Sequence, residues 1–505
     1  MGIPYYFYTL TKLYHNIVSS IQPVKPDIYC LDFNGIIHPV AASIVSTMKH
    51  IDENIIIEKL FKKVEDDISV IQAKKVLICV DGVAPLAKMI QQRKRRYLTV
   101  FKKQIDNEES KWDTNCITPG TQFMKSLNTY FKKRIRYNTL PINMIFSGSD
   151  EAGEGEHKIF TMLLNEKSDA CVMINGLDAD LIILCLMSHR KNIYLMRESN
   201  ENTYVSIDNL RMAILQELSK KWKTPLYQNT YDEEANDIIE SYCVMCSLLG
   251  NDFIPHLLTL NLKTNGLEKL ILCTGNTYGT HGLLVQNSKI NYLALCDILQ
   301  QLAKTENQDI CEETQKYLKK GTYSNYQGKN TNSDFYGIKN KDSVADKIYA
   351  NISNWRYVYY KHLFYANTTI DSSVISMACE SFMIGIYWTY AYYKKHDYDN
   401  TWYYPYAYPP TLKDIANYAI GNNEPLMAKS SIELNSIIQL LIVLPIDSKH
   451  LLENKYQKMM ESSTSGIYHL YPKKYTIHTF LKTHLWECAP ILPTINIKYL
   501  RNHIN

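Results

Sequence analysis

The sequence of 505 residues contains no apolar run long enough to cross a membrane. Its first residues also lack the charged block and the long apolar block of a secretory signal peptide, so we expect a protein of the cytosol or nucleus. The formal net charge of +4 is small for this length, which excludes a global positive field as a source of nucleic-acid affinity. Such affinity would need local basic clusters, and the candidates are residues 88–96, 102–103 and 132–136.

A zinc-binding cysteine pattern is also missing. Cys243 and Cys246 form a CxxC, but they lie in an apolar stretch and no second ligand pair follows at zinc-finger spacing. The 12 cysteines occur mostly within apolar runs, as reduced core cysteines do. We therefore expect core thiols in a protein that folds without disulfides.

What the first half does contain is a set of acids that follow short apolar runs. Four such runs, each with the length and composition of a strand, lead to Asp32, Asp81, Asp178 and Asp252. Because the carboxyl ends of parallel strands meet at one edge of an open α/β sheet, we expect the acids to converge there. The full set is Asp32, Asp81, Glu154, Glu156, Asp178, Asp180 and Asp252.

This acid set predicts a metal site. Buried together, so many carboxylates would repel one another strongly unless a multivalent cation offset their charge. Oxygen ligands suit a hard cation, Mg²⁺ or Mn²⁺, and the doublets at 153–157 and 178–180 suit shared coordination of two ions. The alternative for any single acid is a helix N-cap or a solvated loop residue.

A basic face follows Asp81. After a turn at 82–85 the sequence predicts a helix, and the spacing i, i+4, i+7 and i+8 gives one face to Lys88, Gln92, Arg95 and Arg96. Cations beside an acidic cluster are unexpected unless an anion bridges the two regions, and these side chains offer the donors that phosphate oxygens accept. The alternative is an ordinary solvated basic face.

The organisation of the chain changes along its length. Residues 1–260 alternate strand-like runs with amphipathic helical stretches, which predicts an α/β domain with a mostly parallel sheet. Residues 261–345 begin as helices and end in a polar segment, 320–343, which predicts a flexible loop or linker. Residues 346–505 are predicted to be helical and rich in tyrosine, and we expect them to pack on the α/β domain and cover the active site.

Seven segments carry the family signal of this sequence. They are MetGlyIlePro at 1–4, LeuAspPheAsnGlyIleIleHis at 31–38, AspGlyValAlaPro with LysMetIleGlnGlnArg at 81–93, IleThrProGlyThr at 117–121, GlyGluGlyGluHisLysIle at 153–159, GlyLeuAspAlaAspLeuIle at 176–182 and GlyAsnAspPheIleProHis at 250–256. In this order and spacing they resemble the XRN family of 5′-to-3′ exoribonucleases. Looser similarity continues through 402–410, 441–445, 471–475 and 486–493, and the match looks like the catalytic core alone, without the additional domains of large relatives.

The resemblance implies a nuclease core related to PIN and flap nucleases. It also implies a processive hydrolase that releases mononucleotides from the 5′ end of single-stranded, 5′-monophosphorylated RNA during RNA decay, by two-metal-ion catalysis. The seven acids match the family's metal-binding and catalytic positions, and the four polar residues of the basic face match its terminal-phosphate pocket. His38 and Trp402 match the two groups that hold the first base, by stacking that tolerates any base.

The resemblance also sets expectations about context. The partners would be 5′-monophosphorylated single-stranded RNA and decapping or decay factors, and we expect a monomer without a membrane partner. Nuclear relatives often carry a zinc knuckle, and its absence here favours the cytoplasm. The alternatives are a flap-type 5′ nuclease acting on DNA, against which the missing helix-hairpin-helix signal argues, and an inactive RNA-binding scaffold.

Overall fold

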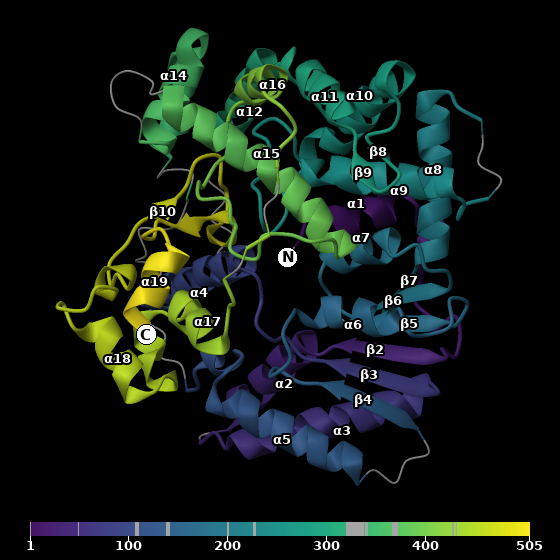
Figure 1. Cartoon of the computed structure of the whole chain (residues 1–505), viewed down its shortest axis with the longest axis vertical. Coiled ribbons are helices and arrows are strands. Elements are labelled where there is room, and N and C mark those ends of the chain that lie inside the picture. The colour runs from purple at the N-terminus through teal and green to yellow at the C-terminus, as the bar shows by residue number, and fades with distance from the viewer. Residues whose placement is uncertain are drawn as a thin grey trace.

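The α/β part of the chain is built on a seven-stranded sheet, with strand order β1-β7-β6-β5-β2-β3-β4 (Figure 1). The computed structural model describes residues 2–48, 50–106, 111–137, 142–198, 201–225, 229–319, 338, 342–365, 372–426, 429–430 and 432–504. The strands are β1 (Val18–Ser19), β2 (Ile28–Asp32), β3 (Lys75–Cys79), β4 (Asn143–Ser147), β5 (Val172–Asn175), β6 (Ile193–Arg197) and β7 (Thr203–Ser206). Strands β2 to β6 are parallel, and β7 pairs antiparallel with both β6 and β1.

Helices cover both faces of this sheet because its central strands are apolar on both sides. Along β2, Tyr29 and Leu31 belong to one buried cluster, while Ile28 and Cys30 belong to the other. Figure 1 shows α2, α3 and α5 on one face and α6 and α7 on the opposite face. The helices of this part are α1 (Tyr6–Leu13), α2 (Asn34–Thr47), α3 (Glu53–Ile71), α4 (Leu86–Asp106), α5 (Gln122–Arg136), α6 (Gly155–Leu163), α7 (Asp180–Met187), α8 (Ile207–Trp222) and α9 (Glu233–Ser247).

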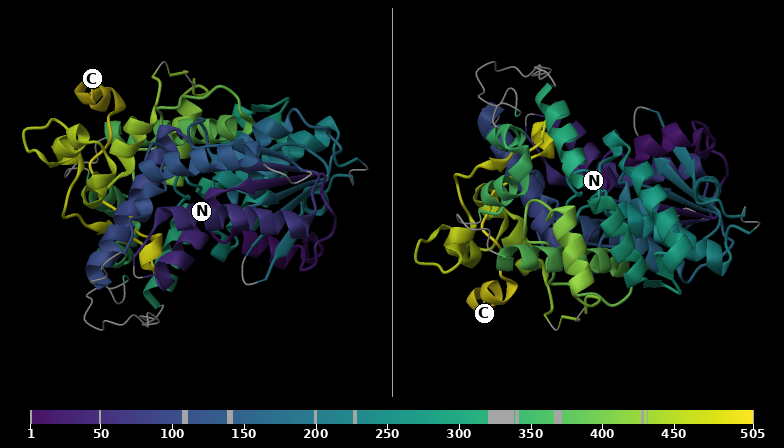
Figure 2. Two further views of the ribbon diagram at one scale, coloured as in Figure 1. Left: turned by 90° about the horizontal axis from the view of Figure 1, so that it is seen from below. Right: turned by 90° about the horizontal axis from the view of Figure 1, so that it is seen from above.

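The rest of the described chain is mainly helical and packs on the α/β part. One buried cluster runs without a break from α7 and α9 into α10, α11 and α15, and a separate cluster joins the start of α4 to α17. Figure 2 shows α4 leading away from the sheet toward the C-terminal elements. The elements are α10 (Gly266–His281), β8 (Val285–Gln286), β9 (Lys289–Ile290), α11 (Tyr292–Ala303), α12 (Glu306–Lys319), α13 (Ser343–Ala350), α14 (Trp355–Leu363), α15 (Ser372–Lys394), α16 (Leu412–Gly421), α17 (Ser436–Val443), α18 (Asn454–Glu461), β10 (Ile477–His478), β11 (Ala489–Pro490) and α19 (Ile497–Ile504).

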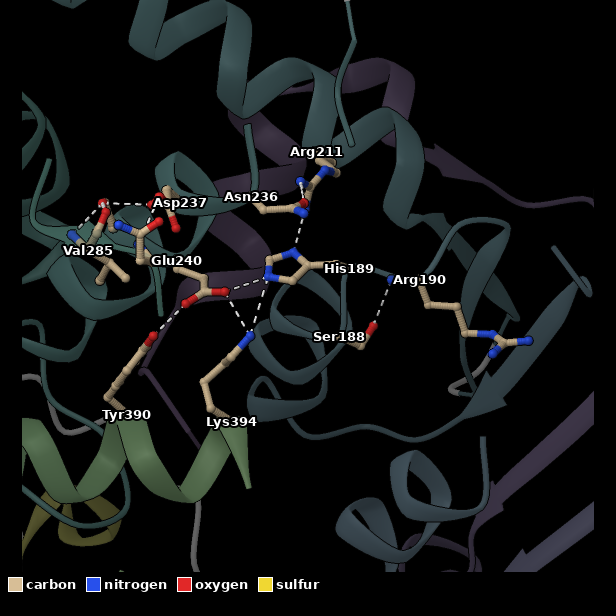
Figure 3. A network of polar contacts seen from close by, with 12 residues as sticks. Ser188, His189, Arg190, Arg211, Asn236, Asp237, Glu240, Val285, Tyr390 and Lys394 are labelled. Carbon is tan, nitrogen blue, oxygen red and sulfur yellow. Dashed lines mark hydrogen bonds and ion pairs between the residues drawn. The ribbon is translucent and has the colours of Figure 1, made fainter. Parts of the chain in front are cut away.

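A buried ionic network anchors the end of α15 to the α/β part (Figure 3). Glu240 of α9 is 2% exposed and accepts hydrogen bonds from Tyr390 at 2.5 Å and Lys394 at 2.7 Å, both on α15. His189 lies 2.6 Å from the same carboxylate, and its other ring nitrogen faces Arg211. Burial alone would raise the pKa of Glu240, but the hydrogen bonds from His189, Lys394 and Tyr390 lower it to about 2. The network therefore holds a charged carboxylate under α15.

The expected fold class is confirmed, and one predicted strand is wrong. The run at 248–250 directly follows α9 and forms a turn, so Asp252 lies in a loop and does not end a strand. The run is apolar because α9 is buried on nearly all sides, which gives its end the composition of a strand. The polar segment 320–343 lies largely outside the described residues, and the boundaries near 260 and 345 stay predictions.

Two further expectations can be compared with the structure. All 12 cysteines are described and carry free thiols, and Cys243 and Cys246 are buried within α9, as expected. No helix among the described residues is long and apolar enough to cross a membrane.

Candidate active site

The predicted acids gather at the carboxyl edge of the sheet. Asp32 is the last residue of β2, and Asp81 follows the end of β3 by two residues. Asp178 and Asp180 lie after β5, with Asp180 at the start of α7, whereas Asp252 arrives from the loop after α9. Glu154 is the N-cap residue of α6, without a side-chain capping hydrogen bond, and Glu156 lies in the first turn of this helix. Both lie near Asp32, and Glu154 also lies near Asp81. Burial is deep for Glu154, Glu156 and Asp180, which are 2–6% exposed.

Close backbone approaches hold this arrangement in place. The N–H of Gly155 donates to Asp81 Oδ1 at 2.6 Å, and Asn34 Oδ1 accepts from the N–H of Asp81 at 3.1 Å. The N–H of Gly2 donates to Asp252 Oδ1 at 3.2 Å. Gly2 has φ +54°, and a Cβ there would lie 2.3 Å from Asp180 Oδ1, so both its conformation and its surroundings favour glycine.

Lys88 lies among the acids. Its ammonium nitrogen is 2.7 Å from Glu154 and 3.0 Å from Asp252, and the side chain is buried. Among the described residues, no group of three or more His, Cys, Asp or Glu side chains is placed to hold a metal ion. The structure thus brings the acids together around a lysine.

The electrostatics of the acids show unbalanced negative charge. Burial, and after it neighbouring carboxylates, raise the pKa of Asp32 and Asp81, and the pKa of Asp81 reaches about 6. Burial and nearby Asp252 raise the pKa of Asp180 to about 7. Asp252 differs: burial alone would raise its pKa, but Lys88 lowers it to about 2. One lysine therefore offsets only part of the charge.

These residues fit a divalent cation in their chemistry. All seven offer carboxylate oxygens, which are the ligands that Mg²⁺ and Mn²⁺ prefer. Asp180 Oδ1 is buried and accepts no hydrogen bond from any described residue, so this oxygen has a lone pair available. A cation would also restore the ordinary pKa of the mutually repelling groups.

The basic face of α4 shares one cavity with the acids. The cavity has a volume of about 450 Å³. Its lining includes Asp32, Asp81, Glu154, Glu156, Asp178, Lys88, Gln92, Arg95 and Arg96. The predicted helix and its common face are therefore confirmed. Burial lowers the pKa of Arg96 to about 10, and its Nη1 is buried without a hydrogen-bond acceptor in the ranges that the structure describes, as expected for a guanidinium that receives an anion.

The two predicted base-stacking residues lie apart. His38, on α2, is exposed and lines the cavity. Trp402 is not among the lining residues; it packs against Trp388 of α15, with ring centroids 5.2 Å apart, and against Gly385. The structure therefore does not bring Trp402 to the cavity that His38 lines.

Sequence reasoning missed two residues of this site. Tyr392 of α15 donates a hydrogen bond to Glu154 and stacks on Trp388 at 5.0 Å. The tyrosine run at 387–393 is visible in the sequence, but nothing in it singles out this hydroxyl. Asn34, which also lines the cavity, stands within the segment 31–38 and carried no signal of its own.

Comparisons with known proteins agree with this architecture. A family model described as XRN 5′-3′ exonuclease N-terminus matches residues 1–199, and one described as Xrn1 helical domain matches 231–336 and 308–505. The N-terminal family domain has a PIN-like fold, in agreement with the observed sheet.

Curated relatives match almost the whole chain. The 5′-3′ exoribonuclease 1 of Homo sapiens is 27% identical, over 99% of this chain and 34% of the human protein. The 5′-3′ exoribonuclease 2 of Gallus gallus and the 5′-3′ exoribonuclease 1 of Saccharomyces cerevisiae are each 24% identical over 99% of this chain, with 69% and 43% of their own lengths covered. The chain thus spans about a third of the length of the human relative and less than half of the yeast one. On the family models and the shared architecture, this chain belongs to the XRN family.

Proposed function

We propose that this protein is a divalent-metal-dependent 5′-to-3′ exoribonuclease that releases mononucleotides from single-stranded RNA with a 5′-monophosphate. The observation that carries the proposal is the single cavity in which an acid cluster adjoins a cationic face. An acid cluster suits phosphodiester hydrolysis, and a cationic face suits an anionic end group. Family membership and the names of the curated relatives support the same reaction.

The cationic face would select the end of the strand. Gln92, Arg95 and Arg96 present an amide and two guanidinium groups to the cavity, and Arg96 Nη1 lacks a hydrogen-bond partner among the described residues. A terminal monophosphate supplies the oxygens that these donors need. A 5′-hydroxyl end supplies none, and the cavity would exclude a bulky capped end.

The acids would carry the hydrolysis. Two divalent cations, when bound, would orient a water for in-line attack and stabilise the departing 3′ oxygen. The carboxylate oxygens at the sheet edge would serve as hard ligands for these cations, and Lys88 balances part of the negative charge of the carboxylates. His38 lies at the cavity where the first base would stack.

The test is a time course on end-labelled strands with Mg²⁺, Mn²⁺ or EDTA. Single-stranded RNA carrying a 5′-monophosphate, triphosphate or hydroxyl would be compared with matched DNA. We expect mononucleotides from the monophosphorylated RNA only, no product with Asp178→Ala, and a smaller preference for monophosphate over hydroxyl ends with Arg96→Met. Lys125→Met, on the exposed surface of α5, removes the same charge as Arg96→Met and serves as the control.

Three results would contradict the proposal. Preferred cleavage of DNA would favour a flap-type nuclease. Bound but uncleaved RNA would favour a scaffold. Normal turnover by Asp178→Ala would remove the acid cluster from the chemistry.

A further inference from the structure

A second cavity system lies beside the candidate active site, on the neighbouring face of α4. It consists of two adjoining cavities of about 190 and 270 Å³, here called the Lys94 chamber. Both are lined by Lys94, Asp252, Phe253, Tyr404 and Glu487. The smaller cavity also shares Arg95 with the active-site cavity, so α4 separates the two spaces.

The chamber has two lysines without an ion-pair partner among the residues that the structure describes. Lys94 and Lys482 line it, and neither ammonium group makes a hydrogen bond or an ion pair among the described residues. Burial lowers the pKa of both lysines. Burial also lowers the pKa of nearby His478 to about 4, and both lysines add to this effect, so the histidine is neutral at pH 7.

The two acids at the chamber are already committed elsewhere. Asp252 is bound by Lys88 at 3.0 Å. Glu487 accepts the N–H and hydroxyl of Thr483 at 2.9 and 3.0 Å, and the N–H of His484 at 3.1 Å. Lys94 and Lys482 are thus two partly buried cations without an ion-pair partner among the described residues, although Glu487 is near enough to Lys482 to oppose the lowering of its pKa. Such an arrangement costs stability unless a ligand supplies further negative charge.

Two amide side chains at the chamber have buried polar atoms without a partner among the described residues. Gln91 of α4 is only 9% exposed, and neither its amide nitrogen nor its amide oxygen has a hydrogen-bond partner there. Asn251 uses its Oδ1 to accept the N–H groups of Phe253 and Ile254, both at 2.9 Å, and its Nδ2 is a buried donor without an acceptor in the described part of the chain. Buried donors of this kind are normally satisfied, so their presence beside the two lysines indicates a polar ligand.

The remaining wall is aromatic. Tyr404, Tyr406, Tyr408 and Phe480 line the larger cavity, and Phe253 lies between the two cavities. Aromatic faces next to cations suit a base and its phosphate, whereas inorganic phosphate would leave the aromatic wall unused. We propose that the Lys94 chamber is a second nucleotide-binding site, in which Lys94, Lys482 and Asn251 hold a phosphate and the tyrosines contact the base.

The proposal rests on the proposed function only for the source of the nucleotide. The ligand is either a free nucleoside 5′-monophosphate, the product of the reaction, or a nucleotide within the RNA strand. Both present the same phosphate and base. Arg95, which lines both the chamber and the active-site cavity, provides a cationic connection between them.

Equilibrium binding distinguishes the two sources. Calorimetric titrations in EDTA, without turnover, would use AMP, adenosine, and 5′-hydroxyl oligoadenylates of four and ten nucleotides. The variants are Lys94→Met and Lys482→Met, with Arg96→Met for the active-site cavity and Lys125→Met as the charge-matched surface control. Because Lys94 has no hydrogen-bond or ion-pair partner among the described residues, Lys94→Met should fold normally with an unchanged or higher Tm, and Lys482→Met provides an independent second variant.

We expect both chamber variants to weaken nucleotide binding about tenfold, as for the loss of one charge-assisted contact, while adenosine is unaffected. If Lys94→Met or Lys482→Met, added to Arg96→Met, removes a remaining AMP-binding site, the free nucleotide is the ligand. Weakened binding of the oligonucleotides alone would identify the strand. Unchanged binding of every ligand, or an equal effect of Lys125→Met, would overturn the proposal. None of these titrations measures cleavage. A negative result for the Lys94 chamber is therefore independent of whether the protein is an exoribonuclease.

Discussion

Gly155 offers a direct test of how tightly the acid cluster is packed. It is the first residue of α6, and a Cβ there would lie 2.8 Å from the carbonyl oxygen of Cys79 and 2.9 Å from Asp32 Oδ1. Both distances are below the 3.0 Å under which Cβ atoms are essentially never found. The Cys79 carbonyl cannot retreat freely, because it accepts the N–H of Phe33 at 2.9 Å. In Gly155→Ala the acids therefore have to move.

The expected size of the effect differs between stability and activity. Overpacking costs about 1–3 kcal/mol, and alanine recovers about 1 kcal/mol through its helix propensity, so the net loss should be about 0–2 kcal/mol. Activity should suffer more, since the N–H of Gly155 also holds Asp81. A displacement of reacting groups by about 1 Å costs about 10²-fold in rate.

The assay compares turnover of 5′-monophosphorylated RNA and thermal unfolding for Gly155→Ala and Gly279→Ala. Gly279 lies within α10, and a Cβ there would meet nothing within 4 Å. Its replacement should leave kcat unchanged and stabilise the protein by about 0.5–1 kcal/mol. Wild-type kcat in Gly155→Ala would refute the view that close packing positions Asp32 and Asp81.

Two further predictions concern buried charges. Lys88→Met leaves Glu154 and Asp252 without their cation, so the free energy of unfolding in EDTA should fall by about 3–5 kcal/mol. Added Mg²⁺ should raise the Tm of the variant more than that of the wild type. An equal Mg²⁺ response would argue against metal binding at these acids. The second change is Glu240→Gln, whose cost follows from the lowered pKa of Glu240: the shift from 4.5 to about 2 corresponds to about 3 kcal/mol. This stabilisation is present above pH 4.5 and is lost as the pH falls through about 2, so urea titrations should show the variant and the wild type converging over that range, and a constant difference would contradict the assignment.

Local sequence patterns predicted those parts of the site that are set by a single helix or by a single strand and the residues next to it. The face of α4 follows from the spacing of Lys88, Gln92 and Arg96, and Asp32 and Asp81 follow genuine strands. The prediction of a strand before Asp252 was wrong because a short apolar run has the same composition in a buried helix as in a buried strand. Only the packing of the second half distinguishes the two.

Contacts between distant segments could not be predicted in this way. The partners of Lys88 at Glu154 and Asp252 are 66 and 164 residues away in sequence, and the residue that binds Glu154 from above, Tyr392, is 238 residues away. Trp402 shows a predicted role that contacts with a distant segment do not support. Its motif predicted a base-stacking residue, whereas its neighbours on α15 place it in an aromatic cluster.

The acid cluster is therefore a joint product of both halves of the chain. Its carboxylates come from the sheet and from the loop after α9, but Glu154 takes a hydrogen bond from Tyr392, and Phe253, next to Asp252, packs edge-on against Trp388 at 4.8 Å. The end of α15 is in turn tied to α9 through Glu240 (Figure 3). Burial is the first cause of the raised pKa of Asp32, Asp81 and Asp180. The helical half that helps to bury these carboxylates therefore also increases the stabilisation that a bound cation would give them. Docking of the helical half is thus part of how the sheet edge acquires its raised carboxylate pKa values.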